Sequence, residues 1–195
     1  MNSITPWLLN HYDEVLGTLF SFIYLYFSIK QNIWLWPLGI ISSAIYAWVF
    51  FDSHIYADMA LQFYYVAISI YGWYYWHLGQ MEQTEKQVKV QFTEKNLWFR
   101  LLPVTVLLFL LISQILIRFT DSEIPYWDAF TTAASITATW MLAKKYIEHW
   151  LIWIIVDLIS SGLYFYKELY FTILLYLVYT VMAVIGYIQW KKDIK

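Results

Sequence analysis

Long apolar runs alternate with short polar connections in this chain, and this alternation limits the possible folds more than any other feature. A bilayer core about 30 Å thick requires about 17 to 25 apolar residues per helix. Hydropathy predicts seven spans, some of them short, at residues 15–29, 33–51, 55–77, 97–117, 126–143, 148–166 and 170–190. With 61% hydrophobic residues, the chain has more apolar surface than one soluble domain of 195 residues can bury. We therefore predict an all-α membrane protein with seven transmembrane helices.

The distribution of Lys and Arg predicts how these helices insert. If the N-terminus is outside, ten of the 12 Lys and Arg residues lie on one face of the membrane, and only Arg118 and Lys167 lie on the other. Lys and Arg are enriched in cytoplasmic loops. We therefore expect an external N-terminus and a cytoplasmic C-terminus. The one sizeable polar segment, residues 78–96, is then a cytoplasmic loop.

An internal repeat relates the second and third spans to the sixth and seventh. Four residues of the third span recur in the seventh at a constant offset of 114, and the segment SSAIY at 42–46 resembles SSGLY at 160–164. The matched third-span residues are Tyr56, Tyr65, Gly72 and Trp76. A shift of four helices keeps the same membrane orientation, as in parallel repeats. We expect a first three-helix repeat at 1–77, the loop at 78–96, a linker helix at 97–118 and a second three-helix repeat at 119–195.

Polar and aromatic side chains form stripes on the predicted helices, because positions three, four and seven apart share one helix face. We consider three of these stripes for solute binding. The stripe on the sixth span contains Trp150, Trp153, Asp157 and Tyr164, the stripe on the third span contains Gln62 and Tyr65, and the seventh span contributes Tyr176. These faces should point inward, because a charged residue in hydrocarbon costs about 2.5 to 3.5 kcal/mol even on the most lenient scale. Solute sites of repeat transporters lie near the midplane between the repeats.

Asp157, in the middle of the sixth span, has two interpretations. It could hydrogen-bond a neighbouring helix and stabilise the bundle, or it could line a solute pathway, the usual role of intramembrane ionisable residues. A carboxylate one turn from Trp153 suits a flat organic cation, which gains both ring stacking and a counter-charge. Asp58 and Asp128 lie near helix N-termini, where capping explains them. We expect Glu148 to be a solvated first-turn acid.

Several function classes are excluded by what the sequence lacks. There is no cysteine, no Gly-rich phosphate loop, and no spacing among the four His residues that would chelate a metal. The seventh span has no Lys for a retinal Schiff base. A net charge of -2 argues against nucleic acid as a partner. We expect neither an enzyme nor a cofactor, and the expected partners are a small molecule and the lipid bilayer.

Five stretches of the chain resemble the Pnu family of bacterial vitamin transporters, which includes nicotinamide riboside and thiamine transporters. They are WPLGIISS from Trp36, YADMALQFYY from Tyr56, IPYWDAF from Ile124, KKYIEHWLIWIIVD from Lys144, and the late LYLVYTVMAVIGYIQW. The resemblance covers the full length and implies a 3+1+3 arrangement like that of SWEET sugar transporters. It also implies facilitated diffusion across the bacterial inner membrane, retention of the vitamin by a cytoplasmic kinase, and a homotrimer.

The resemblance also implies which residues bind the vitamin. The family's Trp that precedes an amide by four residues falls on Trp153, and the amide position is Asp157 here. Its other binding positions fall on Gln62, Ser42 and Trp150, and we count Trp36, Tyr65, Tyr164 and Tyr176 with them.

Two departures from the family pattern bear on the substrate, because Asp157 and Ser42 stand where riboside transporters have Asn. Asn both donates and accepts hydrogen bonds to ribose hydroxyls, whereas an ionised Asp only accepts. The sequence therefore favours thiamine, and nicotinamide riboside is the alternative. A sugar transporter of the SWEET type and a membrane receptor that does not transport remain as further alternatives.

Overall fold

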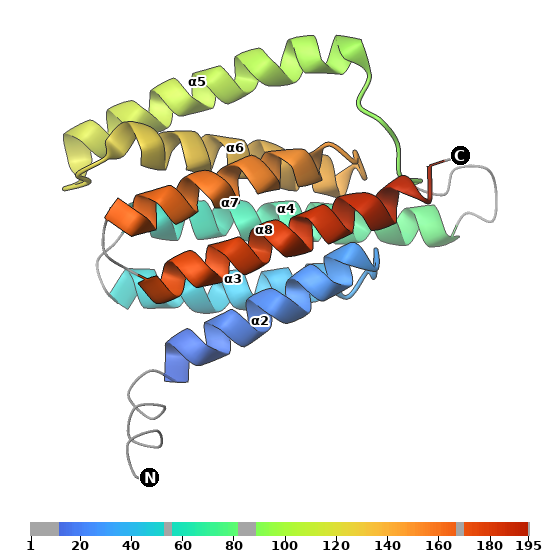
Figure 1. The fold of residues 1–195 in the computed structure, drawn as a ribbon, viewed down its shortest axis with the longest axis horizontal. Coiled ribbons are helices and arrows are strands. Elements are labelled where there is room, and N and C mark those ends of the chain that lie inside the picture. The colour runs from blue at the N-terminus through green and yellow to red at the C-terminus, as the bar shows by residue number, and fades with distance from the viewer. Residues whose placement is uncertain (1–11, 53–55, 82–88, 167–169, 195) are drawn as a thin grey trace. The chain divides into compact units, whose positions relative to one another are not determined.

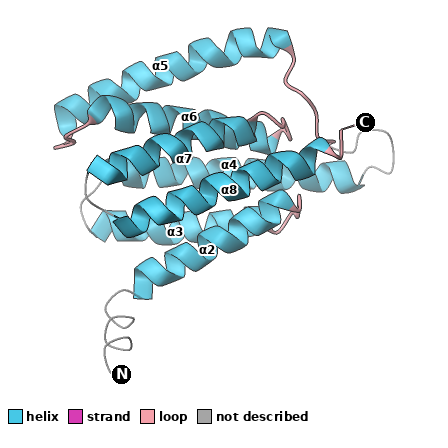
Figure 2. Cartoon of the chain, viewed as in Figure 1, coloured by secondary structure: helices cyan, strands magenta, loops and turns pink. Residues whose placement is uncertain are grey.

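The computed structural model describes residues 12–52, 56–81, 89–166 and 170–194, and its regular structure is helical (Figure 1, Figure 2). Seven helices lie in these ranges: α2 (Tyr12–Ile29), α3 (Leu35–Asp52), α4 (Tyr56–Met81), α5 (Lys95–Phe119), α6 (Pro125–Ala143), α7 (His149–Tyr166) and α8 (Tyr170–Lys191). No strand occurs within these ranges, where the only β-type pairing is an isolated parallel bridge between Gln91 and Tyr146. The prediction of an all-α chain with seven helices is confirmed.

The observed helix ends agree with the predicted spans to within three residues, except at the end of α4. This helix continues to Met81, whereas the apolar span ends at His77. Hydropathy detects apolar residues, but a helix continues as long as its backbone hydrogen bonds are made. The helix α5 likewise begins at Lys95, two residues before the predicted start. The connection between α4 and α5 is therefore shorter than the predicted loop at 78–96.

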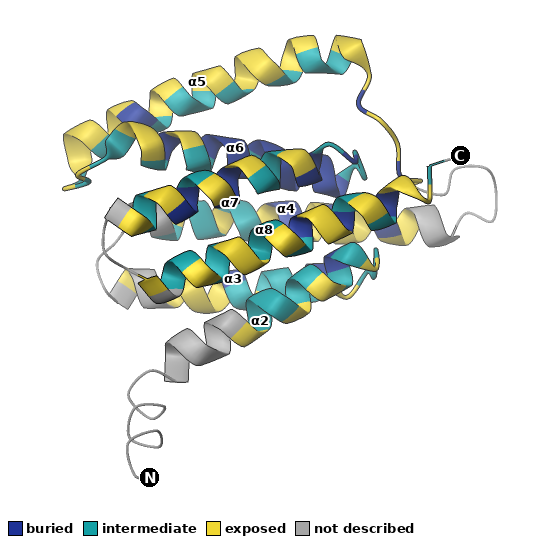
Figure 3. Ribbon diagram, viewed as in Figure 1, coloured by how far each residue is buried: buried dark blue, intermediate teal, exposed yellow. Residues whose placement is uncertain are grey.

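The chain forms two compact units, residues 1–82 and 83–195. In the first unit α3 packs against both α2 and α4; in the second, α5 packs on α6, α6 on α7, and α7 on α8. The most buried helix of the second unit is α6, whereas α5 is largely exposed (Figure 3). Small buried residues of α6, among them Ala129, Ala133 and Ala138, allow close approach of neighbouring helices. The Thr105 and Thr137 hydroxyls also join α5 to α6, 2.7 Å apart.

The same turn precedes the second helix of a hairpin in each unit. Gln31 and Lys145, which are 114 residues apart, both have a left-handed backbone, with φ of 51° and 56°. The backbone N–H of Gln31 donates to Ser28 O at 3.0 Å, and that of Lys145 donates to Leu142 O at 2.9 Å. The following residue donates to the carbonyl five positions earlier in both cases. The two units therefore share this local structure residue for residue.

A tryptophan cluster also recurs at the same offset. In the first cluster (Trp36, Gly72, Trp76) the two indole rings meet edge-on, with centroids 5.3 Å apart at 87°. In the second cluster (Trp150, Gly186, Trp190) the corresponding values are 5.8 Å and 88°. A Cβ on either glycine would lie within 2.4 to 2.7 Å of the ring of Trp36 or Trp150. Glycine is thus required at both positions for the helices to approach so closely.

These correspondences change the alignment of α3 with α7. The matching segments SSAIY and SSGLY pair Ser42 with Ser160, an offset of 118. The turns, the clusters and the helix starts at Leu35 and His149 all have an offset of 114. The sequence-based pairing is therefore one helical turn out of register, an error of four residues that leaves the helix face almost unchanged. In the structural register Ser43 corresponds to Asp157.

Candidate solute-binding site

Asp157 lies in the middle of α7, and its side chain is buried, with 5% of its surface exposed. The neighbouring Ser161 hydroxyl donates to the Asp157 backbone carbonyl at 2.9 Å, and so does not reach the carboxyl group. Among the described residues we find no hydrogen-bond donor to that carboxyl group. The described structure thus gives no support to the interpretation of Asp157 as a hydrogen-bonded link between helices.

Tyr176, one of the predicted tyrosines, lies within electrostatic range of Asp157 and packs against Tyr164. The rings of Tyr164 on α7 and Tyr176 on α8 have centroids 5.1 Å apart, and their hydroxyl groups are hydrogen-bonded. Tyr176 also lies within electrostatic range of Asp157 and of Tyr179, whose ring centroid is 5.7 Å away. The packing of α8 on α7 therefore brings together Asp157, Tyr164 and Tyr176. The cluster combines a carboxyl group, two hydroxyl groups and aromatic faces.

The two predicted tryptophans of α7 have different surroundings. Trp153 precedes Asp157 by about one turn and is half-buried. Trp150 is fully buried in the second tryptophan cluster and also packs against His149, with ring centroids 4.5 Å apart. Trp36 is fully buried in the first cluster. Within the described residues, neither indole N–H of Trp36 or Trp150 has an acceptor.

The predicted residues of the first unit lie on α3 and α4. Gln62 and Tyr65 on α4 and Ser42 on α3 are all half-buried. The Tyr65 ring lies 5.5 Å from that of Tyr64, and Tyr65 also interacts electrostatically with Tyr24 of α2. Tyr24 and Tyr64 were not predicted from the sequence, because a tyrosine of a binding cluster within an apolar run is indistinguishable from one that faces lipid.

The pair formed by Trp153 and Asp157 has no counterpart in the first unit. The positions 114 residues earlier are Gly39 and the buried Ser43. A Cβ on Gly39 would lie 2.8 Å from the Ser69 hydroxyl oxygen and 3.5 Å from the Tyr24 ring, so α2 and α4 occupy that space. The Trp153–Asp157 pair is therefore not repeated at the equivalent positions of the first unit.

The acids at helix starts differ from one another. Asp128, in the first turn of α6, accepts a hydrogen bond from the Ser122 hydroxyl at 2.6 Å, which agrees with a structural role. The side chain of Asp58 lies outside the described residues. The prediction for Glu148 was wrong, because its carboxylate accepts hydrogen bonds from Thr93, 55 positions away. No local pattern in the sequence indicates a contact between residues so far apart.

Length and composition qualify two helices, Lys95–Phe119 and Thr172–Lys191, as candidate membrane spans, and three shorter helices are also apolar. Within the described residues, no group of three or more His, Cys, Asp or Glu side chains is placed to hold a metal ion. The described site offers one carboxyl group, hydroxyl groups and aromatic faces.

Comparisons with known proteins agree with this picture. Residues 11–192 match the model of the nicotinamide mononucleotide transporter family. The chain is 25% identical over 201 residues to the nicotinamide riboside transporter PnuC of Escherichia coli strain K12, covering 91% of this chain and 84% of that protein. It is also 25% identical over 183 residues to the riboflavin/roseoflavin transporter RibM of Streptomyces davaonensis, covering 92% and 84%.

A solved structure has the same fold. The crystal structure of the vitamin B3 transporter PnuC superposes with a TM-score of 0.72 at 23% identity, covering 97% of this chain and 86% of that chain. The family match covers nearly all of the described chain, and the resemblance expected from the sequence is confirmed. The chain belongs to the nicotinamide mononucleotide transporter family, the Pnu family of membrane vitamin transporters.

Proposed function

We propose that this protein carries an unphosphorylated, cationic, aromatic vitamin across the inner membrane by facilitated diffusion. The observation that carries the proposal is the buried Asp157 carboxyl group, which has no hydrogen-bond donor among the described residues and lies within electrostatic range of Tyr176. A buried anionic group of this kind gains most from a cation that also stacks on aromatic rings. In this proposal Trp153 stacks on the vitamin ring and Asp157 supplies the counter-charge.

We propose thiamine as the substrate. Its thiazolium ring is a permanent cation, and the exocyclic amine of its aminopyrimidine can donate a hydrogen bond to a carboxylate. Gln62, Tyr65 and Ser42 would hydrogen-bond the polar substituents. The Trp150 and Trp36 rings are each fully buried against a glycine and a second tryptophan of their own unit, so we assign neither of them a direct contact with the vitamin.

Nicotinamide riboside is the alternative, and the relatives favour it. The Escherichia coli relative is a nicotinamide riboside transporter, and nicotinamide riboside is also a flat cation. The Streptomyces relative transports riboflavin, which is neutral, so the family does not share a single substrate. The carboxyl group at position 157 favours a cation over a neutral flavin. It also gives no donor to ribose hydroxyls, which is the reason for placing thiamine first.

The recurrence at an offset of 114 supports the further proposal of two parallel three-helix repeats, α2 to α4 and α6 to α8, joined by α5. Repeats of this kind move against each other in alternating access. The excess of Lys and Arg on one face supports an external N-terminus and a cytoplasmic C-terminus. A cytoplasmic kinase that phosphorylates the vitamin would then retain it, and a homotrimer is the proposed assembly.

Uptake into liposomes tests the proposal. Purified protein should equilibrate thiamine across the membrane without an ion gradient, and thiamine phosphate should be a poor substrate. The reason is that α7 contains no Lys or Arg and α8 contains none before Lys191, so no cation along these stretches would meet a phosphate group. Equal uptake of both compounds would contradict the proposal, and so would uptake that requires an ion gradient.

A further inference from the structure

The segment before α5 is bound to the turn before α7. The backbone N–H of Gln91 donates to Lys145 O at 3.1 Å, and that of Ile147 donates to Gln91 O at 3.0 Å, which forms the parallel bridge. Thr93 is buried, with 8% of its surface exposed. We call this contact between residues 90–93 and residues 144–148 the clasp. The clasp joins the start of α5 to the start of α7.

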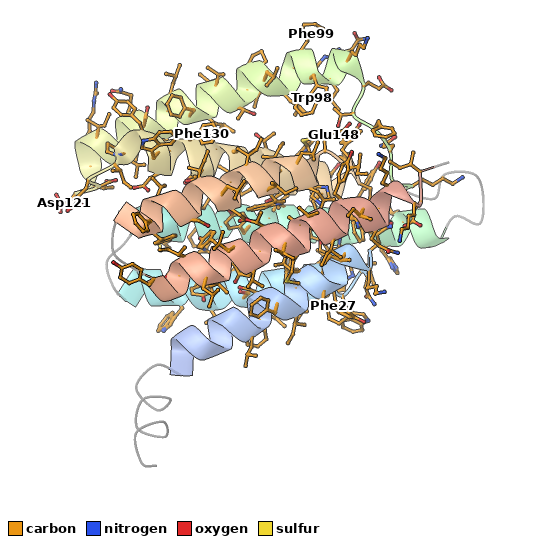
Figure 4. The ribbon with its side chains drawn as sticks, in the orientation of Figure 1. Phe27, Trp98, Phe99, Asp121, Phe130 and Glu148 are labelled. Carbon is orange, nitrogen blue, oxygen red and sulfur yellow. The ribbon has the colours of Figure 1, made fainter. Side chains whose placement is uncertain are left out.

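Glu148 is the charged centre of the clasp. The backbone N–H of Thr93 lies 3.1 and 3.0 Å from the two Glu148 carboxylate oxygens, and the Thr93 hydroxyl donates to Oε2 at 2.7 Å. Figure 4 labels Glu148 at the end of the second unit where α5 begins. Hydrogen bonds to a charged acceptor are about twice as strong as neutral ones. Lys145, in the same turn, remains mostly charged at neutral pH, because burial lowers its pKa only to about 8 and the Asp193 carboxylate opposes the shift.

The turn itself does not need the clasp in order to form. The equivalent turn of the first unit makes the same backbone hydrogen bonds around Gln31. The position equivalent to Glu148 is there occupied by Trp34, and 63% of that side chain is exposed. The clasp is therefore an addition to the second unit, the unit whose helix α7 carries Trp153 and Asp157.

We propose that Glu148 and Thr93 are positioning residues that fix the depth and rotation of α7, an inference that rests on the proposed function. The helix α7 begins at His149, directly after Glu148. Asp157 lies nine residues after Glu148, about 13 Å along the helix axis. Because an α-helix is stiff over this length, a displacement of its first residue also moves Asp157. The clasp thereby sets where Trp153 and Asp157 stand relative to α5 and α6, and it keeps the second unit as one body during transport.

Substitutions of Glu148 test the inference with two measurements, amide hydrogen exchange and vitamin uptake. In Glu148→Ala, the Gln91 and Thr93 amides should exchange about tenfold faster or more, because the charged hydrogen bonds are lost. The KM values for thiamine and for nicotinamide riboside should both rise several-fold and by the same factor, because a displaced α7 affects both vitamins alike. Glu148→Gln keeps an acceptor and should have intermediate effects. Glu123→Gln, an exposed acid between α5 and α6, is the matched control and should change neither measurement.

Three results would overturn the inference. If the amides exchange faster while KM is unchanged, the clasp holds the loop but does not position α7. If exchange is unchanged in Glu148→Ala, Glu148 does not hold the clasp. If the ratio of the two KM values changes, Glu148 contacts the vitamin directly. Failure of the proposed function is distinct, since it would appear in the unsubstituted protein as absence of uptake of either vitamin.

Discussion

Substitution of Gly186 by alanine tests the second tryptophan cluster, the packing that joins α8 to α7. An added Cβ would lie 2.6, 2.6 and 2.7 Å from three ring atoms of Trp150. The ring has little room to move, because Trp190 meets it edge-on and His149 packs against it. Real Cβ atoms do not approach ring carbons so closely, so the ring or α8 must shift.

A matched control in the same unit allows the cost to be isolated. Gly162, on α7, has no atom within 4 Å of an added Cβ. Glycine to alanine in a helix interior is favourable by about 0.5 to 1 kcal/mol when nothing clashes. Both variants gain this helix term, so their difference gives the overpacking cost, which we expect to be about 1 to 3 kcal/mol. Gly162→Ala should therefore be slightly more stable than the unsubstituted protein, and Gly186→Ala less stable than Gly162→Ala by that amount.

The assay is reversible unfolding in mixed detergent micelles, with far-UV circular dichroism as the signal because the substitutions leave the helix content of the folded state unchanged. Gly72→Ala provides a repetition in the first unit, where the equivalent distances are 2.4 to 2.6 Å. Equal stability of Gly186→Ala and Gly162→Ala would refute the described packing of Trp150.

Three further substitutions test other contacts. Tyr176→Phe removes the hydrogen bond to Tyr164 and should cost about 0.5 to 1.5 kcal/mol, and the double variant with Tyr164→Phe should cost less than the sum of the two; additive costs would contradict the bond. Gln31→Val places a β-branched residue at φ 51° and should destabilise by about 1 to 2 kcal/mol, whereas Gln31→Asn should be tolerated; equal stabilities would count against the left-handed turn. Thr137→Val should lose about 1 kcal/mol, since its hydroxyl joins α6 to Thr105 of α5, and an unchanged unfolding midpoint would exclude this contact.

The helices could be predicted from sequence because each is a continuous apolar run, and the membrane imposes their length. Hydropathy contains no information on where a helix stops within polar sequence, so the end of α4 at Met81 was missed. The repeat was predicted from four residues of the third span, two of which, Gly72 and Trp76, lie in one cluster with Trp36 in the structure. The pairing of Ser42 with Ser160 failed because a shift of one turn keeps the same face.

The candidate site was predictable only in part. A carboxylate within an apolar span is an unusual feature, so Asp157 and its neighbours one or two turns away could be identified from spacing alone. The contact of Tyr176 with Tyr164 depends on how α8 packs on α7. The hydrogen bonds of Glu148 depend on a segment 55 residues earlier, and no periodicity encodes a contact over that distance.

The most direct test of the central claim, that Asp157 meets a cationic vitamin, is competition uptake of thiamine and nicotinamide riboside by Asp157→Asn in liposomes. Loss of one charged hydrogen bond of about 1.5 to 3 kcal/mol corresponds to a rise of about tenfold or more in the KM for thiamine. The KM for nicotinamide riboside should fall, because an amide also donates to ribose hydroxyls. Unchanged KM values for both vitamins, in a variant that folds normally, would contradict the assignment of Asp157 to the solute pathway.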